Sequence, residues 1–441
     1  MNLEQRSTNA PVEKPMSVTA AISMGVGAMV GAGIFALLGE AGSRAGNAVY
    51  LSFVIAGIIS LLSGYSYAKL GARYQSSGGI VEFLAQAYGS GYLTGVLSIL
   101  LYLSVAVVMA LVARAFGSYA KALVVPNGPE FWVNCFASTV VVGLTFINAI
   151  GSKLVGGVEK FVVFAKVSIL TVFVAAGFWL IKPGLLFASS GARPPLDILG
   201  TVAVCLLAYH GFGVITNTVE DMPSPSVTLP RAIYGAIGIV MVLYVGVAVA
   251  VFGNLPLSDI VRAKDYAMAE AARPVFGQVG FTVIAIAALM AAASSINANL
   301  YSTAKMTYLL ARDGELPQFE AKKLWRGGTG GLFTTAVLVL VIANLFDLTR
   351  IAALGSIVYL IVYSAVHLGH WKRLSAQTGA NRTVVLLALL TNAGILLVFG
   401  VQTAVTRPFV LYSLAFLVIG AVLAEIYMQV ARGRAIKSAA D

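Results

Sequence analysis

Long apolar segments alternate with short polar ones along almost the whole chain. Most of the apolar segments contain about 20 residues, which is the length that a helix needs to cross the hydrocarbon core of a membrane. The pattern predicts twelve membrane-spanning helices, at Ser17–Leu38, Ala48–Leu70, Tyr92–Tyr119, Phe131–Ile150, Leu154–Ile181, Ile198–Val219, Ile233–Asn254, Phe276–Leu300, Leu332–Phe346, Ile351–His370, Thr383–Val401 and Phe409–Val430. The ninth of them, Leu332–Phe346, is the shortest.

The composition is that of a membrane protein. Hydrophobic residues make up 59% of the chain and charged residues only 11%, whereas a soluble domain carries about 25% charged residues. A water-soluble fold would have to expose much of this apolar surface, but lipid tails solvate it. We therefore predict an all-α polytopic membrane protein, in which no stretch is long and polar enough to form a separate soluble domain.

The positive charges predict an orientation in the membrane. The net charge is +11, but the Lys and Arg residues form short clusters between apolar segments rather than one patch, which argues against a nucleic-acid partner. With the N-terminus in the cytoplasm, about 18 of them face inward and about 10 outward, which agrees with the positive-inside rule. We expect a multi-pass protein of the cell membrane whose polar N-terminal segment (1–15) and tail (431–441) are both cytoplasmic.

Few residues are suited to metal binding or catalysis. Cys135 and Cys205 both lie in apolar segments, and the three His residues form no cluster with them, so neither a disulfide framework nor a metal site is expected. The predicted spans also contain no nucleophile–base pair. We therefore expect no cofactor and no enzymatic activity.

Two glycine pairs interrupt predicted spans near their middles. The first span contains Gly31-Ala-Gly33 and the sixth contains Gly211-Phe-Gly213. Glycine weakens a helix by about 1 kcal/mol relative to alanine. Unwound backbone offers N–H groups that suit a carboxylate and carbonyls that suit an ammonium group. Two such helices facing each other can hold an amino acid by its backbone; the alternative is that the glycines only allow close helix packing.

Four motifs follow one another in a fixed order along the chain. They are the first-helix sequence Gly27–Phe35; Tyr67-Ala-Lys-Leu-Gly71 followed by Ser77-Gly78-Gly79; Glu220-Asp221 followed by Pro225, Thr228 and Pro230-Arg-Ala-Ile233; and Ala311–Pro317. Together they resemble the signatures of the amino acid–polyamine–organocation superfamily of transporters. Gly213 departs from the pattern, because many members have an acidic residue there.

The resemblance implies a LeuT-like fold with a five-plus-five inverted repeat. The two repeats would cover 16–181 and 198–370, and helices 11 and 12, at 383–430, would lie outside the core. Helices 1 and 6 would be broken, with the substrate between them and alternating access by rocking of one bundle. The resemblance assigns the substrate carboxylate to Met29, Gly31, Ala32 and Gly33, and the other side of the site to Tyr209, His210, Gly211 and Phe212, with Phe212 as a candidate gate.

Lys166 lies inside the fifth predicted span. A charged lysine at that depth costs at least about 2.5 kcal/mol, so it is usually paired, cavity-facing or functional. A lysine that loses its hydration also releases its proton more readily. Proton-driven members of the superfamily have a lysine where sodium-driven members bind a cation, and Lys166 resembles it; the resemblance places its ammonium near Gly27, Ser294 and Ser295. The alternative is that Lys166 snorkels to the nearby interface.

The predicted function is secondary active transport of an amino acid by proton symport. Apart from the helix ends, no Asp or Glu lies at mid-membrane depth. A polyamine or a cationic side chain would need one, so a neutral amino acid is favoured. Exchange, and sodium coupling through Ser294 and Ser295, remain open as mechanisms, and a transporter-like receptor without flux is the alternative of a different class. The expected partners are an amino acid, protons and the lipid bilayer, with a homodimer as an open possibility.

Overall fold

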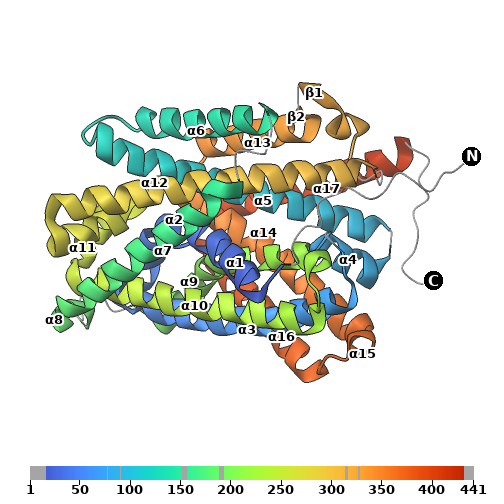
Figure 1. The fold of residues 1–441 in the computed structure, drawn as a ribbon, viewed down its shortest axis with the longest axis horizontal. Coiled ribbons are helices and arrows are strands. Elements are labelled where there is room, and N and C mark those ends of the chain that lie inside the picture. The colour runs from blue at the N-terminus through green and yellow to red at the C-terminus, as the bar shows by residue number, and fades with distance from the viewer. Residues whose placement is uncertain are drawn as a thin grey trace, which may run out of the picture.

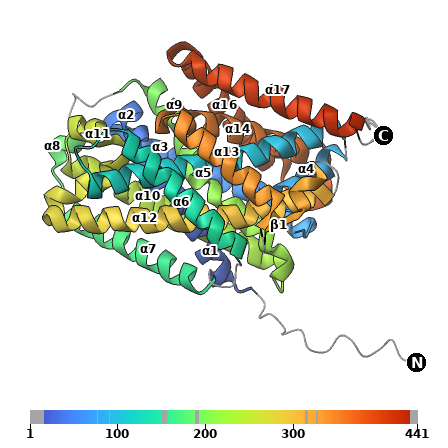
Figure 2. The ribbon, with the colours of Figure 1, turned by 90° about the horizontal axis from the view of Figure 1, so that it is seen from above.

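The computed structural model describes residues 16–76, 78–89, 91–150, 156–187, 193–312, 316–325 and 328–431. These residues form a bundle of helices (Figure 1 and Figure 2) with a small antiparallel pair of strands, β1 (Lys323–Trp325) and β2 (Gly328–Thr329). The segments 1–15 and 432–441, which are predicted to be cytoplasmic, lie outside the described residues.

Most of the helices lie roughly along one axis of the bundle (Figure 1). In chain order they are α1 Val18–Ala32, α2 Ile34–Ala45, α3 Val49–Arg73, α4 Ile80–Tyr88, α5 Tyr92–Val124, α6 Phe131–Ile150, α7 Gly156–Trp179, α8 Pro183–Leu186, α9 Pro195–Tyr209, α10 Pro225–Asn254, α11 Leu257–Ala263, α12 Ala267–Arg312, α13 Gly330–Leu345, α14 Leu348–Gly369, α15 Ser375–Thr378, α16 Arg382–Thr406 and α17 Pro408–Ala431. Short 3-10 segments and one π-helical turn extend them: η1 Gly46–Ala48, η4 His210–Asp221, η5 Lys264–Tyr266, η6 Gln318–Ala321 and the π-helical η7 His370–Leu374.

The helices have the length and composition of membrane spans. In the described part of the chain, 10 helices are long and apolar enough to cross a membrane, and two shorter apolar helices, Val18–Gly31 and Gly330–Leu345, accompany them. The prediction of an all-helical, multi-pass membrane protein is therefore confirmed, whereas the number twelve and the inverted repeat stay predictions. The eighth predicted span proves to be part of α12, which has 46 residues and bends at Gly277, where φ is 65°.

The core of the bundle surrounds α5. Of the most apolar 18-residue stretch of α5, 89% is buried inside the protein, against 17% for α17, and α17 lies along the outside of the bundle (Figure 2). A helix that is apolar on every side is stable only when protein or lipid surrounds it. Protein does so for α5, which packs against α6, α12 and α14.

One buried arginine ties three helices together around α5. The Arg114 guanidinium donates to the Asn134 side chain at 2.8 Å and to the backbone carbonyl of Ala343 at 3.0 Å, and it forms an ion pair with Glu130 at 2.8 Å. Arg114 is only 6% exposed. Because a buried charge is stable only when it is hydrogen-bonded and paired, this contact fixes α6 and α13 against α5.

We expect Arg114→Ala to lower the stability of the purified protein by about 2 kcal/mol, because it removes hydrogen bonds to a charged group and leaves the Ala343 carbonyl unpaired. Thermal unfolding in detergent measures the change as a lower melting temperature. Arg262→Ala is the control, because Arg262 has 81% of its side chain exposed in a surface pair with Asp259, and such pairs contribute about 0–1 kcal/mol. Equal melting temperatures for both variants would contradict the anchoring role.

Candidate substrate site at two interrupted helices

The first interruption divides a span into α1 and α2. α1 ends at Ala32 and α2 begins at Ile34, with Gly33 between them at φ −82° and ψ −82°, well away from the helical ψ of about −42°. The Gly33 N–H still donates to the Met29 carbonyl at 2.9 Å. The N–H groups of the first turn of α2 have no acceptor inside α2 and form its positive end. This helix start is therefore suited to an anionic group.

The second interruption follows α9. α9 ends at Tyr209, and the chain continues for 12 residues as the 3-10 helix η4. Such segments are usually only three or four residues long, because their hydrogen-bond geometry is poor, and long ones often mark functional hinges. The His210 N–H donates to the Leu207 carbonyl, which is three residues back rather than four. The backbone thus changes from α-helical to 3-10 hydrogen bonding in the middle of this span.

The two interruptions touch each other. A Cβ atom on Gly211 would lie 2.5 Å from the Met29 nitrogen and 2.7 Å from the Ala28 carbonyl carbon, and one on Gly33 would lie 2.8 Å from the Ala208 oxygen. Only glycine allows backbones to approach this closely. The positive start of α2 and the carbonyl end of α9 are therefore brought face to face by residues that carry no side chain.

Tyr244 of α10 joins both interruptions through one hydroxyl. This hydroxyl donates to the Met29 carbonyl at 2.7 Å and lies 3.3 Å from the Ala208 carbonyl. The neighbouring Tyr209 hydroxyl donates to the Phe53 carbonyl of α3 at 3.1 Å. The sequence prediction did not include Tyr244, although a tyrosine inside an apolar span is a usable signal, because a buried phenol needs a hydrogen-bond partner.

The predicted substrate residues are packed closely in this structure. Met29 and Tyr209 are fully buried and Phe212 is 1% exposed, with the Phe212 ring edge-on to Tyr67 and to Tyr363 of α14. The predicted residues Gly31, Gly33 and Gly211 are also buried, whereas His210 is half-buried with its ring 5.0 Å from that of Tyr359. Any ligand between the two interruptions therefore requires α1–α2 and η4 to move apart.

Lys166 contacts the interrupted helix directly. Its ammonium donates to the Gly27 carbonyl at 2.7 Å, and the residue is only 2% exposed. α7, which carries Lys166, packs beside α1 and α10 (Figure 1). The two residues that the sequence placed together, Lys166 and Gly27, thus lie together, and the lysine points into the protein rather than snorkelling out.

The two predicted serines lie on α12. A Cβ atom on Gly31 would lie 2.8 Å from the Ser295 Cβ, so Ser295 packs against α1 about one turn beyond Gly27. Ser295 is 5% exposed and its oxygens accept from the Asn299 amide, while the adjacent Ser294 is half-buried. Ser295 and Lys166 therefore both contact α1, at Gly31 and at Gly27.

Residues 16–424 match the amino acid permease family. The chain belongs to the amino acid permease family. This result confirms the resemblance that the four motifs suggested, and it covers both interruptions, Lys166 and the helices around them. Membership supports amino acid transport across a membrane and points to a transporter rather than an enzyme.

Relatives of this permease are found in archaea and bacteria. It is 37% identical to an uncharacterised protein of Methanocaldococcus jannaschii, over 94% of this chain and 95% of the relative. It is 36% identical to the inner membrane transport protein YbaT of Escherichia coli, over 83% of this chain and 84% of the relative. The serine/threonine exchanger SteT of Bacillus subtilis is 24% identical, over 69% of this chain and 70% of its own.

We expect Gly211→Ala to reduce amino acid uptake into proteoliposomes by about tenfold or more, because its methyl group would press on the α1 backbone, and overpacking of this kind costs about 1–3 kcal/mol. Gly238→Ala in α10 is the matched control, since a Cβ atom there meets nothing within 4 Å. Wild-type uptake by Gly211→Ala would show that the close contact of the interruptions is not needed for transport.

Proposed function

We propose that this permease carries a neutral amino acid by proton symport, with alternating access between the two interrupted helices. The observation that carries the proposal is the buried hydrogen bond from the Lys166 ammonium to the Gly27 carbonyl of α1. This bond links a group that can gain and lose a proton to the helix that bears the first interruption. Exposure of that helix to one side of the membrane or the other can then depend on protonation.

The substrate backbone would lie between the start of α2 and the end of α9. We assign the carboxylate to the N–H groups at the start of α2, next to Met29, Gly31, Ala32 and Gly33, because a helix start favours an anion. The ammonium group would bind carbonyls near the end of α9. Tyr209, His210, Gly211 and Phe212 would form the opposite wall, and the Phe212 ring would move when the site opens.

The residues around the interruptions favour a neutral side chain. Neither 27–35 nor 207–215 contains an acidic residue. A cationic side chain buried there would lose its hydration without gaining a carboxylate partner, which is costly. An uncharged side chain avoids this cost. The carboxylate and ammonium groups, which all amino acids share, would bind the backbone at the two interruptions.

The coupling step is a proton transfer at Lys166. In the charged form, the hydrogen bond to the Gly27 carbonyl is charge-assisted, and such bonds are about twice as strong as neutral ones. When Nζ gives its proton to water on the cytoplasmic side, the neutral amine holds α1 less firmly, and α1 can return without substrate. One proton would therefore cross with each amino acid.

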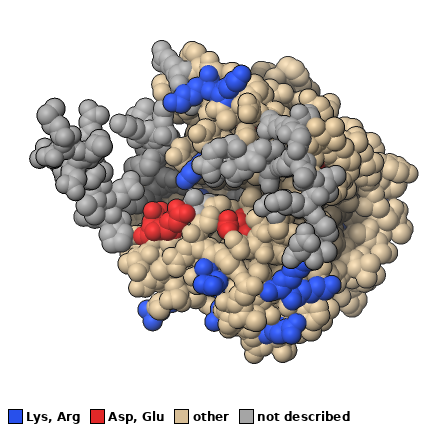
Figure 3. Space-filling view, turned by 90° about the vertical axis from the view of Figure 1, so that its right-hand side faces the viewer, with Lys and Arg blue, Asp and Glu red and all other residues tan. Residues whose placement is uncertain are grey.

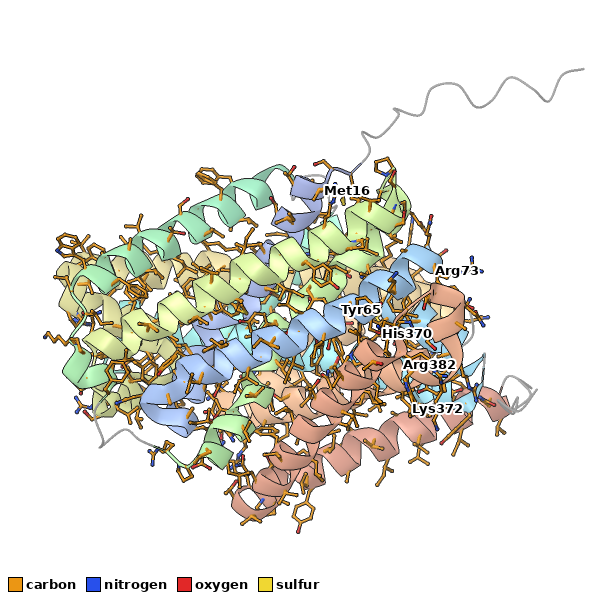
Figure 4. The ribbon with its side chains drawn as sticks, turned by 90° about the horizontal axis from the view of Figure 1, so that it is seen from below. Met16, Tyr65, Arg73, His370, Lys372 and Arg382 are labelled. Atoms are coloured by element: carbon orange, nitrogen blue, oxygen red, sulfur yellow. The ribbon has the colours of Figure 1, made fainter. Side chains whose placement is uncertain are left out.

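The orientation would place the basic end of the bundle in the cytoplasm. Met16, Arg73, Lys372 and Arg382 lie at the same end (Figure 4), and Lys and Arg residues spread over that end face (Figure 3). The positive-inside rule assigns such an end to the cytoplasm. α1 begins at this end. A solute would therefore reach the interruption at Gly33 from the cytoplasm by a path along α1, and from outside by a path along α2.

Exchange of one amino acid for another is the second candidate mechanism. The specific observation in its favour is the relationship to SteT, which is named as a serine/threonine exchanger. An exchanger moves only when loaded and needs no proton at Lys166. Uptake under a pH gradient into vesicles without internal substrate separates the two mechanisms, because only symport concentrates substrate when the pH gradient is the sole driving force.

We expect Lys166→Ala to reduce uptake driven by a pH gradient in proteoliposomes by about tenfold or more, because the transported proton has lost its carrier. A pH-sensitive dye inside the vesicles should show a matching loss of substrate-dependent acidification. Lys372→Ala is the control, since Lys372 is exposed at the end of the bundle. Full gradient-driven uptake by Lys166→Ala would rule out the coupling role and leave exchange as the better account.

A further inference from the structure

Glu40 is a fully buried carboxylate near the far end of α2 from Gly33. Its Oε1 lies 2.7 Å from Arg44 Nε and 3.4 Å from Arg407 Nη1, and its Oε2 lies 2.6 Å from Lys264 Nζ. The Thr349 hydroxyl also donates to Oε2 at 2.7 Å. Four positively charged or hydrogen-bonding side chains therefore converge on one carboxylate.

These partners come from segments that are far apart in the sequence. Arg44 belongs to α2 itself, Lys264 to η5, Thr349 to the first turn of α14, and Arg407 to the junction of α16 and α17. Lys264 also hydrogen-bonds to Thr349. We call Glu40 with these four partners the Glu40 cluster. It joins the half-helix beyond the first interruption to η5, α14 and the α16–α17 junction.

The charges of the Glu40 cluster do not balance. One carboxylate faces three cations, and in the described part of the chain no other carboxylate lies within ion-pair distance of Arg44, Lys264 or Arg407. Asp347 is close enough to attract Arg407 and Asp265 to attract Lys264, but Asp347 forms its own ion pair with Arg350 and Asp265 accepts a hydrogen bond from Ser118. Like charges repel one another, and the three cations are only partly exposed, at 16% for Arg44, 28% for Lys264 and 36% for Arg407. Glu40 is therefore the group that holds three mutually repelling cations together.

The backbone of α2 packs against η5 next to the Glu40 cluster. A Cβ atom on the adjacent Gly39 would lie within 3.0 Å of the Lys264 Cα, so α2 packs directly on η5. α5 bonds to both of these elements. Its Ser118 hydroxyl donates to Asp265 of η5 at 3.2 Å, and its Tyr119 hydroxyl donates to the Phe35 carbonyl of α2 at 3.1 Å. Separation of α2 from η5 would therefore uncover Ser118 and the segment of α2 that leads to the interruption at Gly33.

We propose that Glu40 is a positioning residue of the transport cycle, which closes the end of the permease opposite its basic face and must release its cations for substrate to pass. It touches no substrate; it sets the position of α2 relative to η5, α14 and the α16–α17 junction. The inference rests on alternating access in the proposed function but not on proton coupling. The test below measures how easily a reagent reaches the closed end. Its result is therefore independent of whether Lys166 variants lose proton coupling.

The reporter for the test is Ser118→Cys in a Cys135→Ser background. Ser118 is 4% exposed and lies under η5, so a cysteine of almost the same size there is covered while the Glu40 cluster is closed. The remaining Cys205 is fully buried in α9. The measurement is the rate of modification of the purified, full-length protein by a hydrophilic maleimide, with mass spectrometry to identify the modified cysteine.

We expect Glu40→Gln to speed modification at position 118 by about tenfold, because Arg44, Lys264 and Arg407 lose the buried carboxylate to which all three are paired and repel one another. Addition of Lys264→Gln should slow modification again, because one of the repelling cations is gone; a role in packing alone gives no such reversal. Glu270→Gln is the matched control. Glu270 pairs with Arg273 on the nearby surface at 3.0 Å and should leave the rate unchanged.

Equal modification rates for Glu40→Gln and the parent protein, with melting temperatures showing that both are folded, would overturn the proposal. If Glu40→Gln fails to fold, the single variant Lys264→Gln tests the proposal instead. It removes the 2.6 Å tie between η5 and α2 and keeps the Glu40 carboxylate paired with arginine. Faster modification in that variant supports the proposal, and an unchanged rate overturns it.

Discussion

A helix that stops halfway across a membrane leaves backbone N–H and C=O groups that lipid cannot satisfy. In this permease α1 ends at Gly33 and α9 changes to the 3-10 helix η4 after Tyr209, and these two interruptions touch each other. The glycines let the backbones touch, and the Tyr244 hydroxyl bonds to a carbonyl on one side while lying close to one on the other. Everything else that we infer about transport depends on this pairing of opposite helix ends.

The broken helix is held on both sides of its interruption by charged groups of different kinds. On the α1 side, the buried Lys166 donates to the Gly27 carbonyl; on the α2 side, Glu40 gathers Lys264 and Arg407 from other elements. A lysine can change its charge during a cycle, whereas an ion cluster opens or closes as a unit. The two halves can thus be released at different times, which is what alternating access requires.

The sequence predicts more of the centre of the site than of its surroundings. The glycine pairs and Lys166 are visible because glycine and a lone charge are unfavourable inside an apolar span. Glu40 carries no such signal, since it lies near a span end where charges are common and its partners are up to 367 residues away. The 12-residue 3-10 segment η4 is also not readable from residue types, because neighbouring helices rather than local propensity hold it in place.

The most direct test of the account is a structure of the permease with its bound amino acid, chosen as the one that raises the melting temperature most. The account predicts the carboxylate at the N–H groups that begin α2 and the ammonium at carbonyls near the end of α9, with Gly33 and Gly211 moved apart. An amino acid bound away from both interruptions, or both helices wound without a break around it, would contradict it.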